Sequence, residues 1–336
     1  MFNNKSILIT GGTGSFGKLF IETVIKRFKP KRLIIFSRDE LKQSLMAEKF
    51  NKEKYDFIRF FIGDVRDLDR LILATQDVDY IVHSAAMKQV DIAEYNPMEC
   101  IKTNVTGAEN IVKAALRQKV KRVIALSTDK ASDPINLYGA TKLTSDKIFV
   151  SANNIVGKNP TRFSVVRYGN VAGSRGSIIE IFKRQIQNKK KELPITDVNM
   201  TRFWISLQQA VNFVLKSFTR MKGGEIFISK IPSIKIVDLA KAMAPKLKHK
   251  IIGIRPGEKL HEKMCSNNEA RLTLSFKDYF LIKPSIQFSD QNINYKISSD
   301  KEVGKLVNKN FDYSSNTNPH FLTVREIQEL NKKLGF

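Results

Sequence analysis

A glycine-rich turn near the start of the chain constrains the fold more than any other sequence feature. The apolar run Ser6–Thr10 has the length of a β-strand, and Phe16–Arg27 has the apolar spacing of a helix. Glycines at such a strand-to-helix turn let backbone N–H groups approach a pyrophosphate at the helix N-terminus. The alternative is an ordinary glycine turn. We expect a dinucleotide-binding turn with contacts from Gly11, Thr13, Gly14, Ser15, Phe16 and Gly17.

Strand-like and helix-like segments alternate through the first half of the chain. Apolar runs of strand length occupy residues 32–37, 57–63, 78–84, 120–127 and 162–168, and helical periodicity fills residues 41–50, 67–75, 96–118 and 138–152. The stretch at residues 96–118 is expected to be one long helix or two helices around Gly107. Repeated strand–helix units with right-handed crossovers build a parallel sheet that is covered on both faces. Residues 1–170 are therefore predicted to form an α/β, doubly wound Rossmann domain that binds the cofactor.

The pattern loosens after Gly169, where glycines, prolines and shorter elements dominate. We expect residues 171–285 to form a smaller C-terminal, substrate-binding lobe. Part of this segment, around residues 225–229, is expected to return to the main sheet. Residues 286–336 are rich in Asn, Ser and Lys and are expected to form a C-terminal tail.

The formal charge of +24 raises the question of a nucleic-acid partner. The lysines are spread along the chain, apart from runs at Lys189–Lys191 and Lys246–Lys250, and no basic stripe is interleaved with aromatic residues. We therefore expect no nucleic-acid partner. No apolar stretch approaches the ~18 residues of a membrane span, and the first residues do not resemble a secretory signal, so a cytoplasmic protein without membrane contact is expected. The two cysteines and four histidines lack ligand spacing, which predicts no metal site.

The end of the second predicted strand bears on the choice of cofactor. An acidic residue at the strand end would bind the ribose hydroxyl of NAD, but Ser37 and Arg38 stand there. A hydroxyl and a guanidinium suit the 2′-phosphate of NADP, with Lys42 as a further candidate. In the alternative, Arg38 is solvated and Asp39 binds the ribose. Other candidate cofactor contacts follow the third and fourth strands, at Asp64, Val65, Ala85 and Ala86.

Tyr138 and Lys142 stand four residues apart in a predicted helix, so they share one helix face. Tyrosine has a pKa near ~10. A neighbouring ammonium and a cationic nicotinamide would lower the pKa of Tyr138 and make it a usable acid or base. The alternative is a solvated pair on the helix surface.

Ser127, Thr128, Asp129 and Lys130 close the strand that precedes this helix. Ligands bind at the carboxyl ends of parallel strands. Thr128 can hydrogen-bond a sugar hydroxyl, while Asp129 and Lys130 supply an acid and a base. This extra pair indicates proton transfers beyond those that accompany hydride transfer. The alternative is a charged turn.

Several segments together resemble the inverting UDP-N-acetylglucosamine 4,6-dehydratases of the extended short-chain dehydrogenase/reductase superfamily. They are TGGTGSFG, SRDELKQS, GDVRD, AAMKQV, STDKASDPINLYGATK, RYGNVAGSRGS, MTRFW and IRPGEKLHE. The resemblance runs from about residue 5 to about residue 275. NDP-glucose 4,6-dehydratases carry Thr-Asp-Glu where this chain has Thr128-Asp129-Lys130. Membrane-anchored retaining relatives often carry Met in place of Tyr138.

The resemblance implies a redox-neutral reaction on UDP-N-acetylglucosamine. Tyr138, supported by Lys142, takes the O4 proton as the C4 hydride passes to NADP⁺. Lys130 removes the C5 proton, which requires a neutral amine and thus a depressed pKa. Asp129 protonates the departing C6 hydroxyl. Inversion at C5 gives UDP-2-acetamido-2,6-dideoxy-β-L-arabino-hex-4-ulose, the first intermediate of pseudaminic acid synthesis for surface glycans. The family also suggests a homo-oligomer, a hexamer.

The resemblance implies further binding residues. Asn170, Arg202 and Arg255 match positions that hold the nucleotide diphosphate. The weaker candidates are Lys88, for cofactor and sugar, with Thr103, Lys183 and Glu258 for substrate and Ser127 and Val171 for cofactor. A rival reading is a retaining dehydratase or a 4-epimerase of a UDP-sugar. A non-catalytic cofactor sensor or nucleic-acid-binding protein would be expected to lose Tyr138 or Lys142, and both are present.

Overall fold

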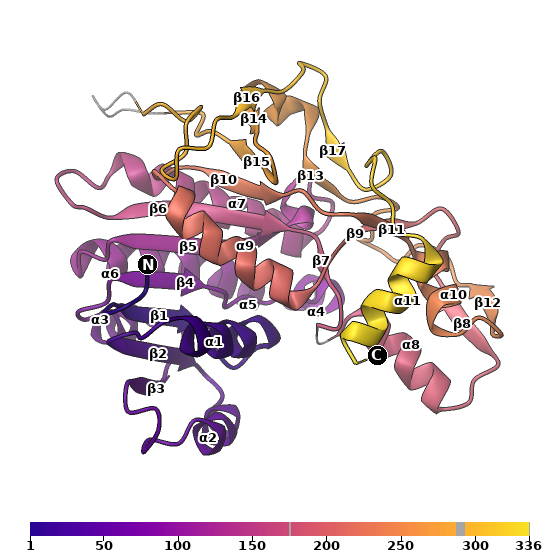
Figure 1. Cartoon of the computed structure of the whole chain (residues 1–336), viewed down its shortest axis with the longest axis horizontal. Coiled ribbons are helices and arrows are strands. Elements are labelled where there is room, and N and C mark those ends of the chain that lie inside the picture. Colours follow the sequence, from indigo (N-terminus) through magenta and orange to yellow (C-terminus); the bar gives the residue numbers. More distant parts are fainter. Residues whose placement is uncertain (175, 287–292, 336) are drawn as a thin grey trace.

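The computed structural model describes residues 1–174, 176–286 and 293–335. The main sheet runs through the centre of the molecule (Figure 1). Its strands, in order across the sheet, are β3 (Ile58–Ile62), β2 (Arg32–Ser37), β1 (Ser6–Thr10), β4 (Tyr80–His83), β5 (Arg122–Thr128), β6 (Arg162–Tyr168), β10 (Ile226–Ser229), β15 (Tyr279–Ile282), β14 (Thr273–Ser275) and β16 (Lys305–Leu306). The strands from β3 to β10 are parallel, and the last three pair antiparallel.

Helices cover both faces of this sheet, which confirms the doubly wound fold. Along β1, Ile7 and Ile9 belong to one apolar cluster and Leu8 to the other, so the strand is buried on both sides. One face packs against α3 (Leu68–Ala74), α6 (Gly107–Arg117) and α7 (Leu137–Ser151). The other face packs against α1 (Ser15–Arg27), α2 (Glu40–Lys49) and α9 (Leu207–Arg220).

The segment at residues 96–118 is interrupted just before Gly107, which agrees with the alternative of two helices around that glycine. It consists of α5 (Pro97–Ile101), a π-helical turn η1 (Lys102–Thr106) and then α6. The short helix α4 (Val90–Tyr95) precedes it. Such π-helical turns are frequent at functional sites.

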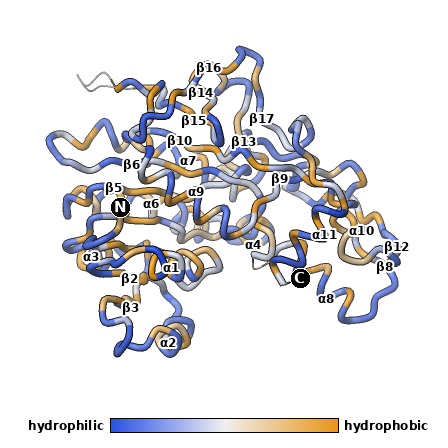
Figure 2. Tube along the Cα trace, in the orientation of Figure 1, coloured by the Kyte–Doolittle hydropathy of each residue, from blue (hydrophilic) through white to orange (hydrophobic). Residues whose placement is uncertain are grey.

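The second lobe lies beside the carboxyl ends of the parallel strands (Figure 1). It contains the strands β7 (Asn170–Val171), β8 (Glu192–Ile195), β9 (Thr201–Ile205), β11 (Ser233–Lys235) and β12 (Lys248–Ile251), with the helices α8 (Ile178–Gln187), α10 (Ile236–Met243) and α11 (Val324–Lys333). A separate apolar cluster holds the lobe together, and Ile327 of α11 is part of it. Figure 2 shows hydrophilic residues along the outer part of the lobe, around β8 and β12.

The sequence-based boundaries at residues 171 and 285 do not coincide with these two bodies. β10 lies in the main sheet, where the segment around residues 225–229 was expected to return, but β14 and β15 from the expected lobe and β16 from the expected tail lie in that sheet too. Conversely, α11 of the tail packs on α10 of the lobe. β14 and β16 are three and two residues long, so they carry no alternation that a sequence pattern could reveal. No helix in the described ranges is both long and apolar enough to cross a membrane.

Candidate active site

The glycine turn between β1 and α1 has the shape that a pyrophosphate requires. Gly11 has φ +64°, and a Cβ there would lie 2.9 Å from the backbone nitrogen of Ala85. Gly14 stands at the N-cap of α1, whose first turn contains no acidic residue. No side chain caps this helix N-terminus and no carboxylate of the first turn competes for its N–H groups. These N–H groups can therefore donate hydrogen bonds to a dinucleotide phosphate.

Replacing Gly11 with alanine is expected to lower the free energy of unfolding by roughly 3 kcal/mol and to reduce the content of bound cofactor. Both effects follow from backbone strain at positive φ and the collision with Ala85. Urea denaturation and nucleotide analysis of the purified protein measure them. Gly157→Ala is the matched control, because Gly157 has φ +54° but no atom within 4 Å of the added Cβ. Equal losses in the two variants would contradict the close-approach role of Gly11.

The residues that follow β2 are arranged around the start of α2. Ser37 is buried, and its hydroxyl accepts a hydrogen bond from Gln43 Nε2 at 3.0 Å. Asp39 caps α2 by accepting the Lys42 N–H at 2.8 Å, and its carboxylate also pairs with the Lys42 ammonium. Arg38 is more exposed, and its guanidinium lies 3.4 Å from Asp64. The Asp39 carboxylate is thus engaged in capping α2, while the Arg38 side chain extends toward solvent.

The other expected cofactor contacts lie along the same edge of the sheet. Asp64 forms an ion pair with Arg66 at 2.7 Å. Val65 is buried, whereas Ala85 and Ala86 line the turn after β4. His83 at the end of β4 is buried and lies 2.9 Å from Thr10 Oγ1. Burial lowers the pKa of His83 to about 3, so this residue is a neutral core histidine.

The candidate catalytic residues come from the end of β5, a 3₁₀ turn (Asp129–Ala131) and the first turns of α7. Asn136 caps α7 by accepting the Gly139 N–H at 2.8 Å, and its own amide donates to the Gly257 carbonyl at 2.7 Å. A Cβ at Gly139 would collide with the Lys130 carbonyl oxygen. The close approach of helix and turn therefore brings Tyr138 next to Thr128 and Lys130.

Tyr138 is buried in this arrangement, with 9% of its surface exposed. Burial raises the pKa of Tyr138 to about 12, and Lys130 is the largest charge that opposes this rise. In the protein by itself, Lys130 rather than Lys142 is the cation that lowers the pKa of Tyr138. The Lys142 ammonium instead donates to the Leu126 carbonyl at 2.7 Å, and burial lowers its pKa.

A buried ion pair behind Lys142 was not among the residues expected from the sequence. Asp146, one helical turn beyond Lys142, accepts a hydrogen bond from Ser127 Oγ at 2.8 Å. Arg167 on β6 lies 3.2 Å from Asp146 and donates to the Met264 carbonyl at 2.7 Å. Both side chains are fully buried, so this pair ties α7 and β5 to the segment around residue 264. The one feature of the sequence that could have pointed to Asp146 is its position four residues after Lys142 on the same helix face.

Lys130 lies between two buried carboxylates. Its Nζ is 3.1 Å from Asp129 Oδ1 and 3.1 Å from Glu262 Oε1. Burial favours the neutral amine, but the two carboxylates outweigh it and raise the pKa of Lys130. The expected depressed pKa of Lys130 is therefore wrong, because the sequence did not show that two anions face one ammonium. Burial raises the pKa of Asp129 above its ordinary value.

Glu262 was also not among the expected residues, although it closes the motif IRPGEKLHE. It is 2% exposed, and its Oε1 lies 3.8 Å from Arg202 Nε. Arg202 is buried and reaches Glu258 at 3.5 Å, and Arg255 pairs with Glu258 at 3.0 Å. A chain of ion pairs through Glu262 thus links three of the expected substrate residues, Arg202, Glu258 and Arg255, to the Asp129–Lys130 pair.

The remaining candidates come from other elements of the chain. The Thr103 hydroxyl, in the π-helical turn, and Asn170 Oδ1 are buried atoms without a hydrogen-bond partner in the described part of the chain. Buried polar atoms normally have partners, so both suit contacts to a bound ligand. Lys88 is exposed and lies within electrostatic reach of Lys130 and Glu180. Val171 follows Asn170 in β7, and Lys183 lies on α8, 3.5 Å from the Gly335 carbonyl.

The C-terminal segment around residues 313–315 packs against the backbone of Glu262. β17 (Tyr313–Ser314) pairs antiparallel with β13 (Lys263–Cys265). The Glu262 N–H donates to Ser315 Oγ at 2.9 Å, and the Ser315 N–H donates to the Glu262 carbonyl at 2.8 Å. The segment after residue 286 therefore takes part in forming the cluster.

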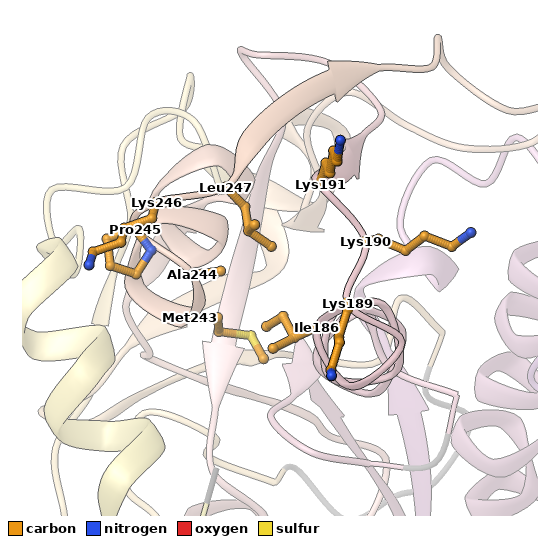
Figure 3. Close-up of a pocket in the computed structure, with 9 residues that line it drawn as sticks. All are labelled: Ile186, Lys189, Lys190, Lys191, Met243, Ala244, Pro245, Lys246 and Leu247. Carbon is orange, nitrogen blue, oxygen red and sulfur yellow. The ribbon is translucent and has the colours of Figure 1, made fainter.

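The two lysine runs meet at a pocket in the second lobe. The pocket has a volume of about 460 Å³ and is lined by Ile186, Lys189–Lys191 and Met243–Leu247. Its apolar side chains face one another, whereas the lysine ammonium groups point outward (Figure 3). The described lining contains no aromatic residue and none of the candidate catalytic residues, so this pocket is separate from the Lys130 cluster.

Known proteins and a solved structure resemble this chain over its full length. Residues 7–284 match the polysaccharide biosynthesis protein family. The chain is 58% identical to the UDP-N-acetylglucosamine 4,6-dehydratase (inverting) of Campylobacter jejuni, with 100% of both chains covered. It is 40% identical to the UDP-glucose 4-epimerase of Rickettsia canadensis, with 100% of this chain and 98% of the relative covered. The solved structure of Pen from Bacillus thuringiensis has a TM-score of 0.88 and 37% identity, and covers 100% of this chain and 99% of that chain. The chain therefore belongs to the polysaccharide biosynthesis protein family, with an extended short-chain dehydrogenase/reductase fold, and aligns over its full length with the inverting UDP-N-acetylglucosamine 4,6-dehydratases.

Proposed function

We propose that this chain catalyses NADP-dependent 4,6-dehydration of UDP-N-acetylglucosamine with inversion at C5. The observation that carries the proposal is the cluster in which Tyr138 adjoins the Asp129–Lys130 pair. An oxidoreductase that moves only a hydride needs the tyrosine and its lysine. A dehydratase needs an additional acid and base beside them, and this cluster supplies both.

We propose NADP as the cofactor. When bound, it would accept the hydride from C4 of the sugar and later return a hydride to C6. The residues proposed to hold it are Gly11, Thr13, Gly14, Ser15, Phe16, Gly17, Ser37, Arg38, Lys42, Asp64, Val65, Ala85, Ala86, Lys88, Ser127, Lys142 and Val171. The uncapped first turn of α1 fits the pyrophosphate, and the outward guanidinium of Arg38 fits a 2′-phosphate.

Tyr138 is proposed to take the O4 proton when C4 is oxidised. Only the phenolate can accept that proton, so Tyr138 must first release its own proton to solvent. The raised pKa of Tyr138 opposes this release, and a nearby positive charge favours it. Among the charged groups of the protein, Lys130 lowers the pKa of Tyr138 the most. The Lys142 ammonium donates a hydrogen bond to the Leu126 carbonyl. Thr128 hydrogen-bonds Tyr138 and is proposed to orient the O4 hydroxyl.

Water loss needs a neutral amine and a protonated carboxylic acid at the same moment. Transfer of one proton from Lys130 to Asp129, which are 3.1 Å apart, produces both. The Lys130 amine then takes the C5 proton, the C5–H electrons form the C5–C6 double bond, and the C6–O bond breaks. Asp129 donates its proton to the leaving hydroxyl, so water departs. The pair thus ends with Lys130 protonated and Asp129 ionised, as it began.

The diphosphate of the substrate is proposed to bind Arg202 and Arg255, because a guanidinium can contact phosphate through two N–H groups. Glu258 holds both guanidinium groups, at 3.5 Å and 3.0 Å. Asn170 and Thr103 are proposed to contact the substrate with their buried polar atoms, and Lys88 and Lys183 from the rim.

The decisive test is incubation of the purified protein with UDP-N-acetylglucosamine in deuterated water, followed by mass spectrometry and proton NMR. Loss of one water with deuterium at C5 and L-arabino couplings would support the proposal. The D-xylo configuration would indicate a retaining dehydratase. An unchanged mass with inversion at C4 would indicate an epimerase, a second candidate that the 40% identity to the Rickettsia canadensis protein favours.

Arg38→Ala is expected to weaken NADP binding about 10- to 100-fold, because a hydrogen bond to a charged group contributes about 1.5–3 kcal/mol, while NAD binding changes little. Titration of the cofactor-free protein with each dinucleotide measures the effect. Arg32→Ala is the control, since Arg32 lies at the other end of the same strand and donates to the Gln76 carbonyl. If NADP selectivity survives Arg38→Ala, another group must recognise the 2′-phosphate.

We further propose that the product enters pseudaminic acid synthesis, that the enzyme works in the cytoplasm and that it is a homo-oligomer, a hexamer. Light scattering on the eluting protein tests the last point. A monomer in solution would overturn it.

A further inference from the structure

Glu262 is a buried acid that the proposed reaction does not use directly. It is 2% exposed and its Oε1 contacts the Lys130 ammonium at 3.1 Å. Its other oxygen, Oε2, is buried and has no hydrogen-bond partner among the described residues. Both backbone groups of Glu262 are hydrogen-bonded to Ser315, which fixes the backbone that carries this side chain just before β13. A buried carboxylate is costly unless it is paired, and here its pairing is with the proposed base.

We propose that Glu262 is a positioning residue that holds Lys130 against Asp129 and sets the pH range in which that pair carries the single shared proton it needs for water loss. This inference rests on the proposed function. It assigns a role to a side chain that touches neither the reacting atoms nor the cofactor.

The position of Glu262 has two consequences for the pair. Asp129 and Glu262 hold the same ammonium from two sides, which keeps the Lys130 side chain in one place. Burial has the largest effect on the pKa of Asp129 and of Lys130, and the attraction between the two residues comes second. The Glu262 charge comes third and raises both pKa values. Among the other groups that face the cluster, Arg202 and Lys259 lower the pKa of Glu262, so that it stays ionised. Lys88 and the Tyr138 phenol also lie within electrostatic reach of Lys130.

The sign of the pH effect follows from these charges. The pair is active with one proton, so activity is lost at low pH when Asp129 gains a second proton and at high pH when Lys130 loses the only one. An anion at residue 262 raises both pKa values. Removing that anion should therefore move both limbs of the pH profile to lower pH, by roughly one unit or more for a charge within about 4–6 Å.

Glu262→Gln keeps the size of the side chain and removes its charge. We expect kcat for water loss to fall about 10- to 100-fold, a part of the about 10²- to 10⁴-fold that a positioned acid or base contributes, and both pH limbs to move to lower pH. C4 oxidation in a single turnover, measured by trapping the 4-keto sugar with borodeuteride, should stay within about threefold of the wild type. That retained first step also shows that the variant is folded.

Glu258→Gln is the matched control, because Glu258 contacts Arg202 but forms no ion pair with Lys130. It should raise KM and leave the pH limbs in place. Glu262→Asp keeps the charge but withdraws it by one methylene, and it should slow water loss while leaving the limbs in place. If both limbs of the pH profile stay in place in Glu262→Gln, the inference is overturned. If Glu262→Gln does not fold, the test passes to Glu262→Asp, in which equal slowing of C4 oxidation and water loss would overturn the inference. A wild type that does not dehydrate UDP-N-acetylglucosamine would instead overturn the proposed function.

Discussion

Replacing Tyr138 with phenylalanine is expected to lower kcat by about 10³-fold, within the range of general acid–base catalysis. The variant loses only the phenolic hydroxyl, so the ring still packs against Ala93 and Cys100 and the protein should fold. Without that hydroxyl the O4 proton has no acceptor, and C4 oxidation, the first chemical step, should stop. No 4-keto sugar should then be trapped, and no deuterium should enter C5.

Tyr80→Phe is the matched control for this change. Tyr80 is buried to the same extent as Tyr138, with 9% of its surface exposed, but it lies at the start of β4, at the opposite edge of the sheet. Its replacement should leave kcat and KM within about twofold, as for a substitution away from the named destabilising mechanisms. If Tyr138→Phe retains wild-type turnover, the role assigned to the phenol is wrong.

Replacing Lys130 with alanine is expected to separate the two halves of the reaction. Water loss and C5 exchange should fall by about 10³-fold or more, because the base is absent. C4 oxidation should continue at a reduced rate, because Lys130 lowers the pKa of Tyr138 more than any other charged group does, and its removal leaves less phenolate to accept the O4 proton. Trapping of the 4-keto sugar measures the first step, and mass spectrometry with NMR in deuterated water measures the second.

Lys130→Arg tests whether the charge or the proton transfer is needed. Arginine can keep the ion pairs with Asp129 and Glu262, but it does not lose its proton in a protein. C4 oxidation should therefore be close to that of the wild type, while water loss stays as slow as in the alanine variant. Full dehydratase turnover in either variant would show that another group removes the C5 proton.

The sequence by itself determined the features that depend on neighbouring residues. The turn from β1 to α1, the i, i+4 placement of Tyr138 and Lys142 and the position of Asp129 and Lys130 after β5 are all local. Helix and strand periods convert such spacing directly into geometry. The parallel strands and their covering helices follow in the same way from alternating periodicity, as far as β6.

Only the tertiary structure decided which distant groups meet. Glu262 faces Lys130, Arg167 pairs with Asp146, and Ser315 holds the backbone of Glu262, although these partners are far apart in the chain. Two of the antiparallel strands added to the main sheet, β14 and β16, are too short to show a pattern in the sequence. The pKa of Lys130 depends on the same long-range contacts: burial alone would lower it, whereas the two carboxylates that the fold places around the ammonium raise it. Spacing along a chain determines a local shape, but charge pairing and burial are properties of segments that folding brings together.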